Sequence, residues 1–189
     1  MGPGYFTQPS LCADRIVFVC EDDLWEVDSS GGQARRLTNS RSEIKTPYLD
    51  PSGKWIACCA KEEGDPDVYL MSADGGPLTR LTWLNSVTRI VGWTPDGSSI
   101  LFHSIHQAVH HRGSDAWLFK VGVDGGPVQR LTFGPAVSLN YQKKGPGIVL
   151  ARNSMNNSRW KRYRGGMVGE IWIDEQGKGN FQRILNDLE

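Results

Sequence analysis

The chain of 189 residues carries its histidines close together, at His103, His106, His110 and His111. A histidine that is oriented by a carboxylate can activate a serine or cysteine nucleophile, and histidines at suitable spacing can bind a metal. The chain has no G-x-S-x-G or H-E-x-x-H motif and no glycine-rich phosphate loop to support either chemistry. We therefore predict no catalytic residue, no metal site and no cofactor, and interpret the histidines as solvated residues near the end of a strand and in the loop that follows it, with adventitious metal binding as the alternative.

A second candidate is the segment SRWKRYRGG at 158–166, in which basic residues alternate with aromatic ones. Such a segment can contact phosphates and stack on bases, can bind a peptide, or can form a solvated loop. Lys plus Arg and Asp plus Glu both total 21, so net charge gives no argument for nucleic acid or a membrane as a partner, and we predict neither. The candidate substrate-binding residues here are Arg159, Lys161, Arg162 and Arg164.

The four cysteines show no metal-binding spacing. The chain has no C-x-x-C pair, and the neighbours Cys58 and Cys59 would point to opposite faces of a strand. Small buried thiols in a reducing compartment are the simplest interpretation. The chain also has no apolar run long enough to span a membrane and no secretion signal, so we predict a cytoplasmic protein.

A phrase that recurs about every fifty residues indicates how the chain is organised. DGGPLTRLTW at 74–83 returns as DGGPVQRLTF at 124–133, and Arg-Leu-Thr also stands at 36–38, with Arg183-Ile184-Leu185 as a degenerate fourth copy. A period of this length is typical of repeat architectures. Glycine tolerates the dihedral angles of a hairpin loop, so we interpret DGG as a turn and Arg-Leu-Thr as the strand after it.

Each repeat predicts four short strands. Runs rich in β-forming residues, such as RIVFVC at 15–20, are preceded by turns and followed by an acidic, an apolar and an aromatic residue. These sets align Trp25 of Asp23-Leu24-Trp25 with Trp117 of Asp115-Ala116-Trp117. Four-stranded antiparallel units of this size are the blades of a β-propeller. We therefore predict an all-β fold with Trp25, Trp117 and Trp172 between the blades. The single domain 1–189 would contain blades at 6–39, 44–83, 87–134 and 135–186.

The repeats resemble those of tricorn-type, TolB-type and prolyl-oligopeptidase-type propellers. Two longer segments, DRIVFVCEDDLWEVD at 14–28 and RWKRYRGGMVGEIWID at 159–174, resemble the N-terminal six-bladed propeller of the tricorn protease family. This resemblance implies a non-catalytic part of a cytoplasmic serine protease that degrades oligopeptides, in which the propeller lines a channel for substrate or product. The catalytic residues of that family lie in later domains, so the remaining propeller and protease domains would be partners.

The resemblance also implies a peptide site and an assembly. In the family, two adjacent arginines in the loop before the third blade hold the carboxylate end of the peptide; here the connection WLNSVTRIVGW at 83–93 offers Arg89 near that place. Four blades of a six-bladed ring would form an incomplete propeller with two bare faces, which predicts a homo-oligomer, or else a re-closed four-bladed ring. The alternative function is a free-standing propeller that binds a protein partner.

Overall fold

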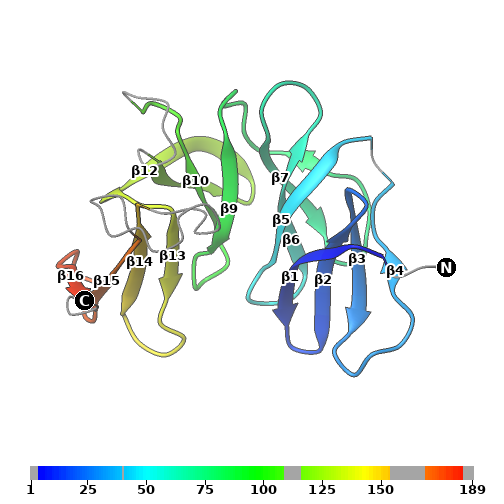
Figure 1. The fold of residues 1–189 in the computed structure, drawn as a ribbon, viewed down its shortest axis with the longest axis horizontal. Coiled ribbons are helices and arrows are strands. Elements are labelled where there is room, and N and C mark those ends of the chain that lie inside the picture. The colour runs from blue at the N-terminus through cyan, green and yellow to red at the C-terminus, as the bar shows by residue number, and fades with distance from the viewer. Residues whose placement is uncertain (1–3, 40, 109–115, 154–168, 185–189) are drawn as a thin grey trace.

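A computed structural model describes residues 4–39, 41–108, 116–153 and 169–184 (Figure 1). In this part of the chain every regular element is a β-strand. The strands are β1 (Phe6–Cys12), β2 (Arg15–Cys20), β3 (Asp23–Asp28), β4 (Arg35–Arg36), β5 (Glu43–Leu49), β6 (Trp55–Lys61), β7 (Asp67–Ser72), β8 (Thr79–Arg80), β9 (Thr88–Trp93), β10 (Ser99–Ser104), β11 (Trp117–Gly122), β12 (Gly125–Pro135), β13 (Ser138–Tyr141), β14 (Ile148–Arg152), β15 (Glu170–Asp174) and β16 (Gln182–Ile184).

The strands form four antiparallel sheets, each made of four strands in chain order. Figure 1 shows the sheets following one another from the blue first sheet to the fourth sheet, whose strands run from yellow to red. The first strands of successive sheets contact each other, β1 with β5, β5 with β9 and β9 with β13. The sheets are therefore propeller blades whose first strands are innermost, and the predicted all-β propeller fold is confirmed.

The tandem glycines reverse the chain between the third and fourth strands, as predicted. Gly75 and Gly76 have φ angles of 101° and 127°, and the Gly75 amide donates to the Ser72 carbonyl over 3.1 Å. Positive φ is open to glycine because it lacks a Cβ atom. After the turn, the Leu81 amide donates to the Val68 carbonyl over 2.8 Å. The repeated phrase is thus a turn followed by the outer strand of a blade.

The acidic residue that opens each third strand is the partner of the repeated Arg-Leu-Thr. Asp67 accepts hydrogen bonds from Arg80 over 2.5 Å and from the Thr82 hydroxyl over 2.7 Å. In the first blade Asp23 accepts from Arg36 and Thr38 in the same way. In the first and second blades these hydrogen bonds therefore join the start of the third strand to the outer edge of the blade.

The third blade departs from this pattern. Its register pairs Phe119 with Arg130, as Tyr69 pairs with Arg80, so Phe119 and not Trp117 takes the aromatic place of the repeat. The expected alignment of Trp117 with Trp25 is therefore wrong by two residues. The Arg130 guanidinium lies over the Trp117 ring at 4.5 Å, where a cation–π contact takes the place of the ion pair.

Apolar side chains fill the seams between successive blades. Buried clusters join the first blade to the second, the second to the third and the third to the fourth. Trp117 and Trp172 pack against the second and third of these clusters, as predicted. No apolar cluster of the described residues joins the fourth blade to the first. These residues thus form an incomplete propeller, an arc with two uncovered ends rather than a re-closed ring, and Trp25 lies at one of those ends.

Candidate functional site

The innermost strands bring residues from all four blades around one hollow of about 400 Å³. Its wall is built from the last residues of β1, β5, β9 and β13 and the turns that follow them. Each of these strands runs along the inner edge of its blade, so the hollow lies on the side where the blades converge. The side chains of its lining include Leu11, Tyr48, Trp93, Asn140, Tyr141, Gln142 and Lys143.

Side chains of one blade hold the inner strand of the next. The Thr46 amide donates to the Gln8 side-chain oxygen over 2.5 Å, and the Ile90 amide donates to the Thr46 hydroxyl over 3.3 Å. The Trp93 indole N–H donates to the Tyr48 carbonyl over 2.9 Å. Gln8 and Thr46 reach these positions from bulges in their strands, with φ angles of 54° and 49°. The wall of the hollow is therefore tied together across the first three blades.

The lining of this hollow suits binding rather than bond cleavage. Burial raises the pKa of Tyr48 and of Tyr141, so both phenols are neutral donors at neutral pH. Aromatic faces, side-chain amides and the Lys143 ammonium can stack on and hydrogen-bond to a peptide. The described lining holds no histidine that could activate a nucleophile.

The predicted peptide-binding residues separate into two groups. Arg89 is an exposed residue of the innermost strand β9, opposite His103 in the register of β10. Arg89 lies toward the start of β9, whereas the residues of β9 that line the hollow begin at Val91. Arg89 therefore belongs to an innermost strand but lies outside the hollow. The other four predicted residues, Arg159, Lys161, Arg162 and Arg164, lie outside the described residues.

The histidines do not form a catalytic group in the described part of the chain. His103 is buried in β10, and its Nδ1 lies 2.6 Å from the Val137 carbonyl, where the neutral ring donates. The solvated-loop interpretation is wrong for this residue, because its side chain fills the space between the third and fourth blades. Burial lowers the pKa of His103. His106 contacts the Phe119 ring edge-on, and His110 and His111 lie outside the described residues.

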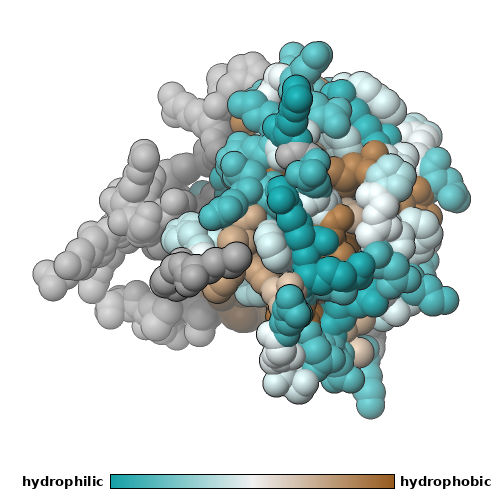
Figure 2. Space-filling view, turned by 90° about the vertical axis from the view of Figure 1, so that its right-hand side faces the viewer, coloured by the Kyte–Doolittle hydropathy of each residue, from teal (hydrophilic) through white to brown (hydrophobic). Residues whose placement is uncertain are grey.

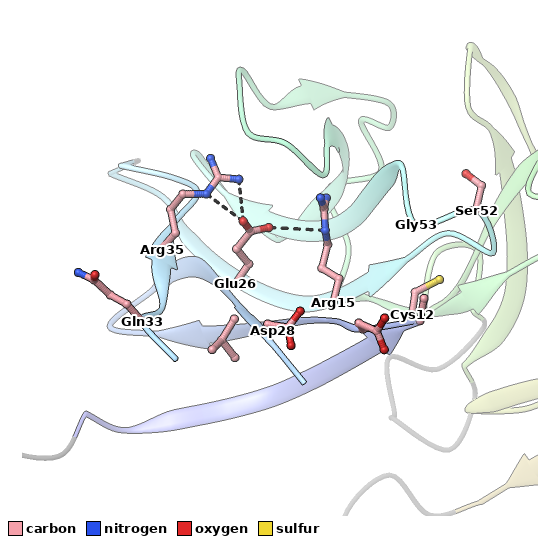
Figure 3. A pocket seen from close by; sticks show the side chains of 11 residues that line it. Cys12, Arg15, Glu26, Asp28, Gln33, Arg35, Ser52 and Gly53 are labelled. Atoms are coloured by element: carbon pink, nitrogen blue, oxygen red, sulfur yellow. Dashed lines mark hydrogen bonds and ion pairs between the residues drawn. The ribbon is translucent and has the colours of Figure 1, made fainter. Parts of the chain in front are cut away.

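A larger hollow, of about 640 Å³, lies beside the first and second blades. Figure 3 shows Arg15 and Arg35 reaching toward Glu26 from two sides. Arg35 lies 2.7 Å from one Glu26 oxygen, and the Arg15 Nε lies 3.7 Å from the other. The charges of Arg15, Glu26 and Arg35 are therefore paired with one another, whereas Asp28 accepts hydrogen bonds from Ser30.

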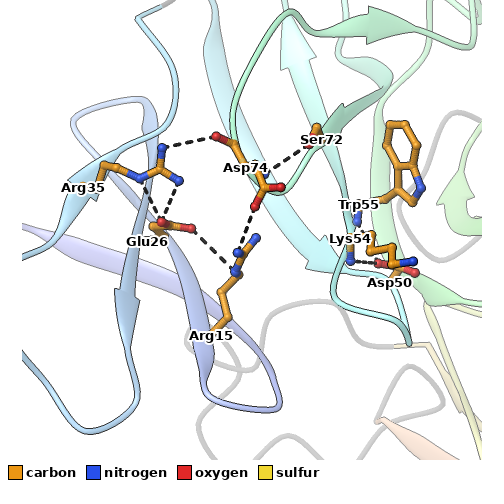
Figure 4. Close-up of polar contacts among 8 residues, drawn as sticks. All are labelled: Arg15, Glu26, Arg35, Asp50, Lys54, Trp55, Ser72 and Asp74. Atoms are coloured by element: carbon orange, nitrogen blue, oxygen red, sulfur yellow. Dashed lines mark hydrogen bonds and ion pairs between the residues drawn. The ribbon is translucent and has the colours of Figure 1, made fainter.

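The same arginines reach the second blade. Arg15 donates to the Asp74 carboxylate over 3.0 Å and Arg35 donates to the Asp74 carbonyl over 3.2 Å (Figure 4). Figure 4 also shows Asp50 accepting from the Lys54 and Trp55 amides, which closes the turn before β6. The acid of the DGG turn thus joins neighbouring blades, a role that the repeat alone did not predict. We interpret this hollow as a structural clamp.

Cys20, Cys58 and Cys59 are buried as the sequence predicts, whereas Cys12 is only partly buried. Cys58 belongs to the cluster between the first two blades and Cys59 to the cluster between the second and third, so they face opposite sides of β6. Burial raises the pKa of both thiols, that of Cys59 to about 11. Among the described residues no group of histidine, cysteine and acidic side chains could hold a metal, and no helix is long and apolar enough to cross a membrane.

Comparison with known protein families identifies the family of this chain. The family model of the tricorn protease N-terminal β-propeller domain matches residues 3–189. The chain belongs to this family. Tricorn protease homolog 1 of Streptomyces coelicolor is 33% identical over 190 residues, which cover 99% of this chain and 17% of that protein. The tricorn propeller chain therefore spans about a sixth of the length of this relative.

Two further comparisons bear on the tricorn propeller. The crystal structure of the tricorn protease superposes with a TM-score of 0.81 at 29% identity and covers 96% of this chain and 18% of that one. A tricorn-like protease N-terminal subunit of Sulfurisphaera tokodaii is 28% identical over 182 residues, which cover 94% of this chain and 89% of that protein. The family thus includes both much longer proteins and one of nearly this length.

Proposed function

We propose that this chain is the non-catalytic N-terminal propeller of a cytoplasmic tricorn-type serine protease that degrades oligopeptides, and that it lines a passage for peptides. The observation that carries the proposal is the hollow built jointly by the ends of all four innermost strands. Membership of the tricorn propeller family supports the link to a protease. The described lining offers binding groups and no histidine that could activate its Cys12 thiol or Thr94 hydroxyl, so we assign bond cleavage to other domains.

The passage would discriminate between peptides by width and lining. A hollow of about 400 Å³ is within the size range of small-molecule sites, so it accommodates a short extended segment and excludes folded chains. Tyr48, Trp93 and Tyr141 present aromatic surface, while Lys143 attracts carboxylates. Peptides with apolar or aromatic side chains would therefore be retained longest.

Basic residues outside the hollow are proposed as further peptide contacts. Arg89 is an exposed residue of the innermost strand β9. A guanidinium matches a carboxylate through two parallel hydrogen bonds, so Arg89 suits the carboxylate end of a peptide. Arg159, Lys161, Arg162 and Arg164 are proposed to contribute the same chemistry from the segment before β15.

The proposed partners follow from the size of the family members. The relatives that match first are about six times longer, so the remaining propeller and protease domains are proposed as partners of this piece. The Sulfurisphaera protein of nearly the same length supports the proposal that such a propeller acts as a separate subunit. We include further copies of the chain among its partners, since the arc leaves two blade faces uncovered.

Calorimetric titration with short peptides tests the proposal. We expect binding by the chain and no peptide cleavage above background, with affinity reduced about tenfold or more in Tyr48→Ala, which removes a lining aromatic ring. Trp55→Ala is the matched control, because Trp55 is an exposed aromatic residue outside the hollow. Equal binding by both variants, or cleavage of peptides by the chain alone, would contradict the proposal.

A further inference from the structure

The first two innermost strands carry the same irregularity at the same place. Both β1 and β5 contain a bulge, where their register with the next strand shifts. Each bulge holds a residue other than glycine with a positive φ angle, Gln8 at 54° and Thr46 at 49°, and a proline follows each of them. A residue with a Cβ atom is strained in this region, above all a β-branched one, and the strain persists only where other contacts stabilise it.

The side chains of these two strained residues supply such contacts. The Gln8 side-chain oxygen accepts from the Thr46 amide, and the Thr46 hydroxyl accepts in turn from the Ile90 amide. Each bulge thus directs a polar side chain to the backbone of the next innermost strand. The bulge of β9 contains Val91, an apolar residue that packs between the third and fourth blades and cannot accept a hydrogen bond. The series therefore ends with the hydroxyl of Thr46.

The bulge of β5 fixes two aromatic residues of the hollow. Regular pairing resumes at Tyr48, opposite Ala57, and the Tyr48 side chain is 37% exposed in the lining. The Tyr48 carbonyl accepts from the indole N–H of Trp93, whose side chain is 8% exposed. The backbone conformation at Thr46, two residues before Tyr48, therefore determines where both rings lie.

We propose that Thr46 is a positioning residue for peptide binding, and that its hydroxyl holds Tyr48 and Trp93 in the arrangement that binds an aromatic side chain of a peptide. The inference rests on the peptide-binding function proposed above and adds the residue that sets its selectivity. Thr46 does not line the hollow, so it acts through Tyr48 and not by contact with the peptide. Its hydroxyl stabilises the strained bulge because it gives the Ile90 amide an acceptor.

Three variants separate the hydroxyl of Thr46 from its shape. Thr46→Val keeps the branched shape and the strain at this φ angle but cannot accept from the Ile90 amide. Thr46→Ser keeps the acceptor. Thr79→Val is the matched control, because Thr79 is an exposed threonine of β8, the outer strand of the same blade. Circular dichroism and thermal melting establish that all three variants fold.

Apolar surface elsewhere on the molecule makes a comparison of two peptides necessary. Figure 2, a view from the side of the first blade, shows brown, apolar patches among teal side chains. Such surface can retain an aromatic peptide without a shaped site. The calorimetric titration therefore uses an alanine tetrapeptide and the same peptide with one phenylalanine, and the ratio of the two affinities measures the selectivity.

The indole N–H of Trp93 provides a second measurement that needs no peptide. Its signal in a two-dimensional NMR spectrum of the chain with isotope-labelled tryptophan, assigned with Trp93→Phe, reports the hydrogen bond to the Tyr48 carbonyl. We expect Thr46→Val to shift this signal and to reduce the preference for the phenylalanine peptide about fivefold, because one hydrogen bond that holds the site is lost. Thr46→Ser and Thr79→Val should match the natural chain in both measurements.

The possible failures of this inference and of the proposed function differ. If the natural chain prefers the phenylalanine peptide and Thr46→Val does so equally, Thr46 does not set the selectivity, while peptide binding stands. An unshifted indole signal in Thr46→Val, or an equal loss of preference in Thr46→Ser, would overturn the role of the hydroxyl in the same way. If the natural chain binds neither peptide, the proposed function and this inference are both wrong.

Discussion

The guanidinium of Arg80 donates to the carboxylate of Asp67 over 2.5 Å, although 13 residues separate them in the chain. Asp67 is 1% exposed, and its other oxygen accepts from the Thr82 hydroxyl and the Leu84 amide. A buried carboxylate is stable only when its oxygens accept hydrogen bonds, and here the donors lie in the outer strand of the blade and directly after it. The hydrogen bond to Asp67, together with the negative charge of this carboxylate, raises the pKa of the Arg80 guanidinium.

Removal of the Asp67 carboxylate should destabilise the second blade strongly. Asp67→Ala leaves the Thr82 hydroxyl and the Leu84 amide without their acceptor, so we expect the free energy of unfolding to fall by about 3 kcal/mol. Urea denaturation followed by circular dichroism measures the change. Glu63→Ala, an exposed acid of the preceding loop, serves as the control and should change stability by less than about 0.5 kcal/mol. Equal effects of both substitutions would show that the hydrogen bonds to Asp67 contribute little.

The buried ring of His103 predicts a loss of stability in mild acid. Its pKa is lowered from 6.5, mainly by burial, so between 6.5 and the lower folded pKa the unfolded chain binds more protons than the folded one. Stability contributed by the neutral ring is therefore complete above 6.5 and is lost as the pH falls below that value.

His103→Asn isolates this effect, because an amide can still donate to the Val137 carbonyl but does not titrate near neutral pH. Thermal melting between about pH 7 and pH 5 should show a smaller decrease in melting temperature for this variant than for the natural chain. His106→Asn is the comparison for a histidine that is only partly buried. Parallel melting curves for all three proteins would contradict the prediction.

A turn glycine before β10 should be required for its backbone angle rather than for its size. Gly97 has a φ of 71°, in the left-handed region, and its nearest neighbours leave ordinary contact distances for a Cβ atom. We expect Gly97→Ala to lower the free energy of unfolding by about 1 kcal/mol and Gly97→Asn to lower it less, because asparagine adopts this conformation more readily. Chemical denaturation compares the two variants. A larger loss in Gly97→Asn would indicate that steric space, not φ, limits this position.

The four thiols should differ in reactivity in the folded chain. Cys58 and Cys59 are buried and burial raises the pKa of both, so few reactive thiolates form at about pH 8. Cys12 is only partly buried. Alkylation with iodoacetamide followed by peptide mass spectrometry should modify Cys12 first, and all four thiols should react in denaturant. Rapid modification of Cys58 in the native chain would contradict its position in the first seam.

Much of the fold could be predicted from short stretches of sequence. Paired glycines, β-branched runs and turn prolines act within a few residues, because they depend on local backbone angles and on side-chain alternation. The turn at Gly75 and Gly76 and the opposite orientation of Cys58 and Cys59 follow from these local rules. Repetition of the same pattern indicated blades, and resemblance indicated the family.

Other features depended on how distant segments meet. The spacing of Asp67 and Arg80 is constant in the first two blades, but the shifted register around Trp117 and Phe119 could be found only from strand pairing. The same limit applies to His103, which lies at the end of a predicted strand and is expected from the sequence to be solvated, but is buried because the fourth blade covers it.

The sequence by itself thus determined the strands, their turns and their order, since these are set by interactions between residues that are near one another in the chain. The tertiary structure decided which faces are covered and which side chains surround the hollow at Tyr48 and Trp93. Burial depends on the neighbour that packs against a face, and residues about forty positions apart become that neighbour only after the blades have turned around a common axis. For the same reason Leu11 and Leu49 occupy equivalent positions in their blades, yet one is exposed and the other is in the core.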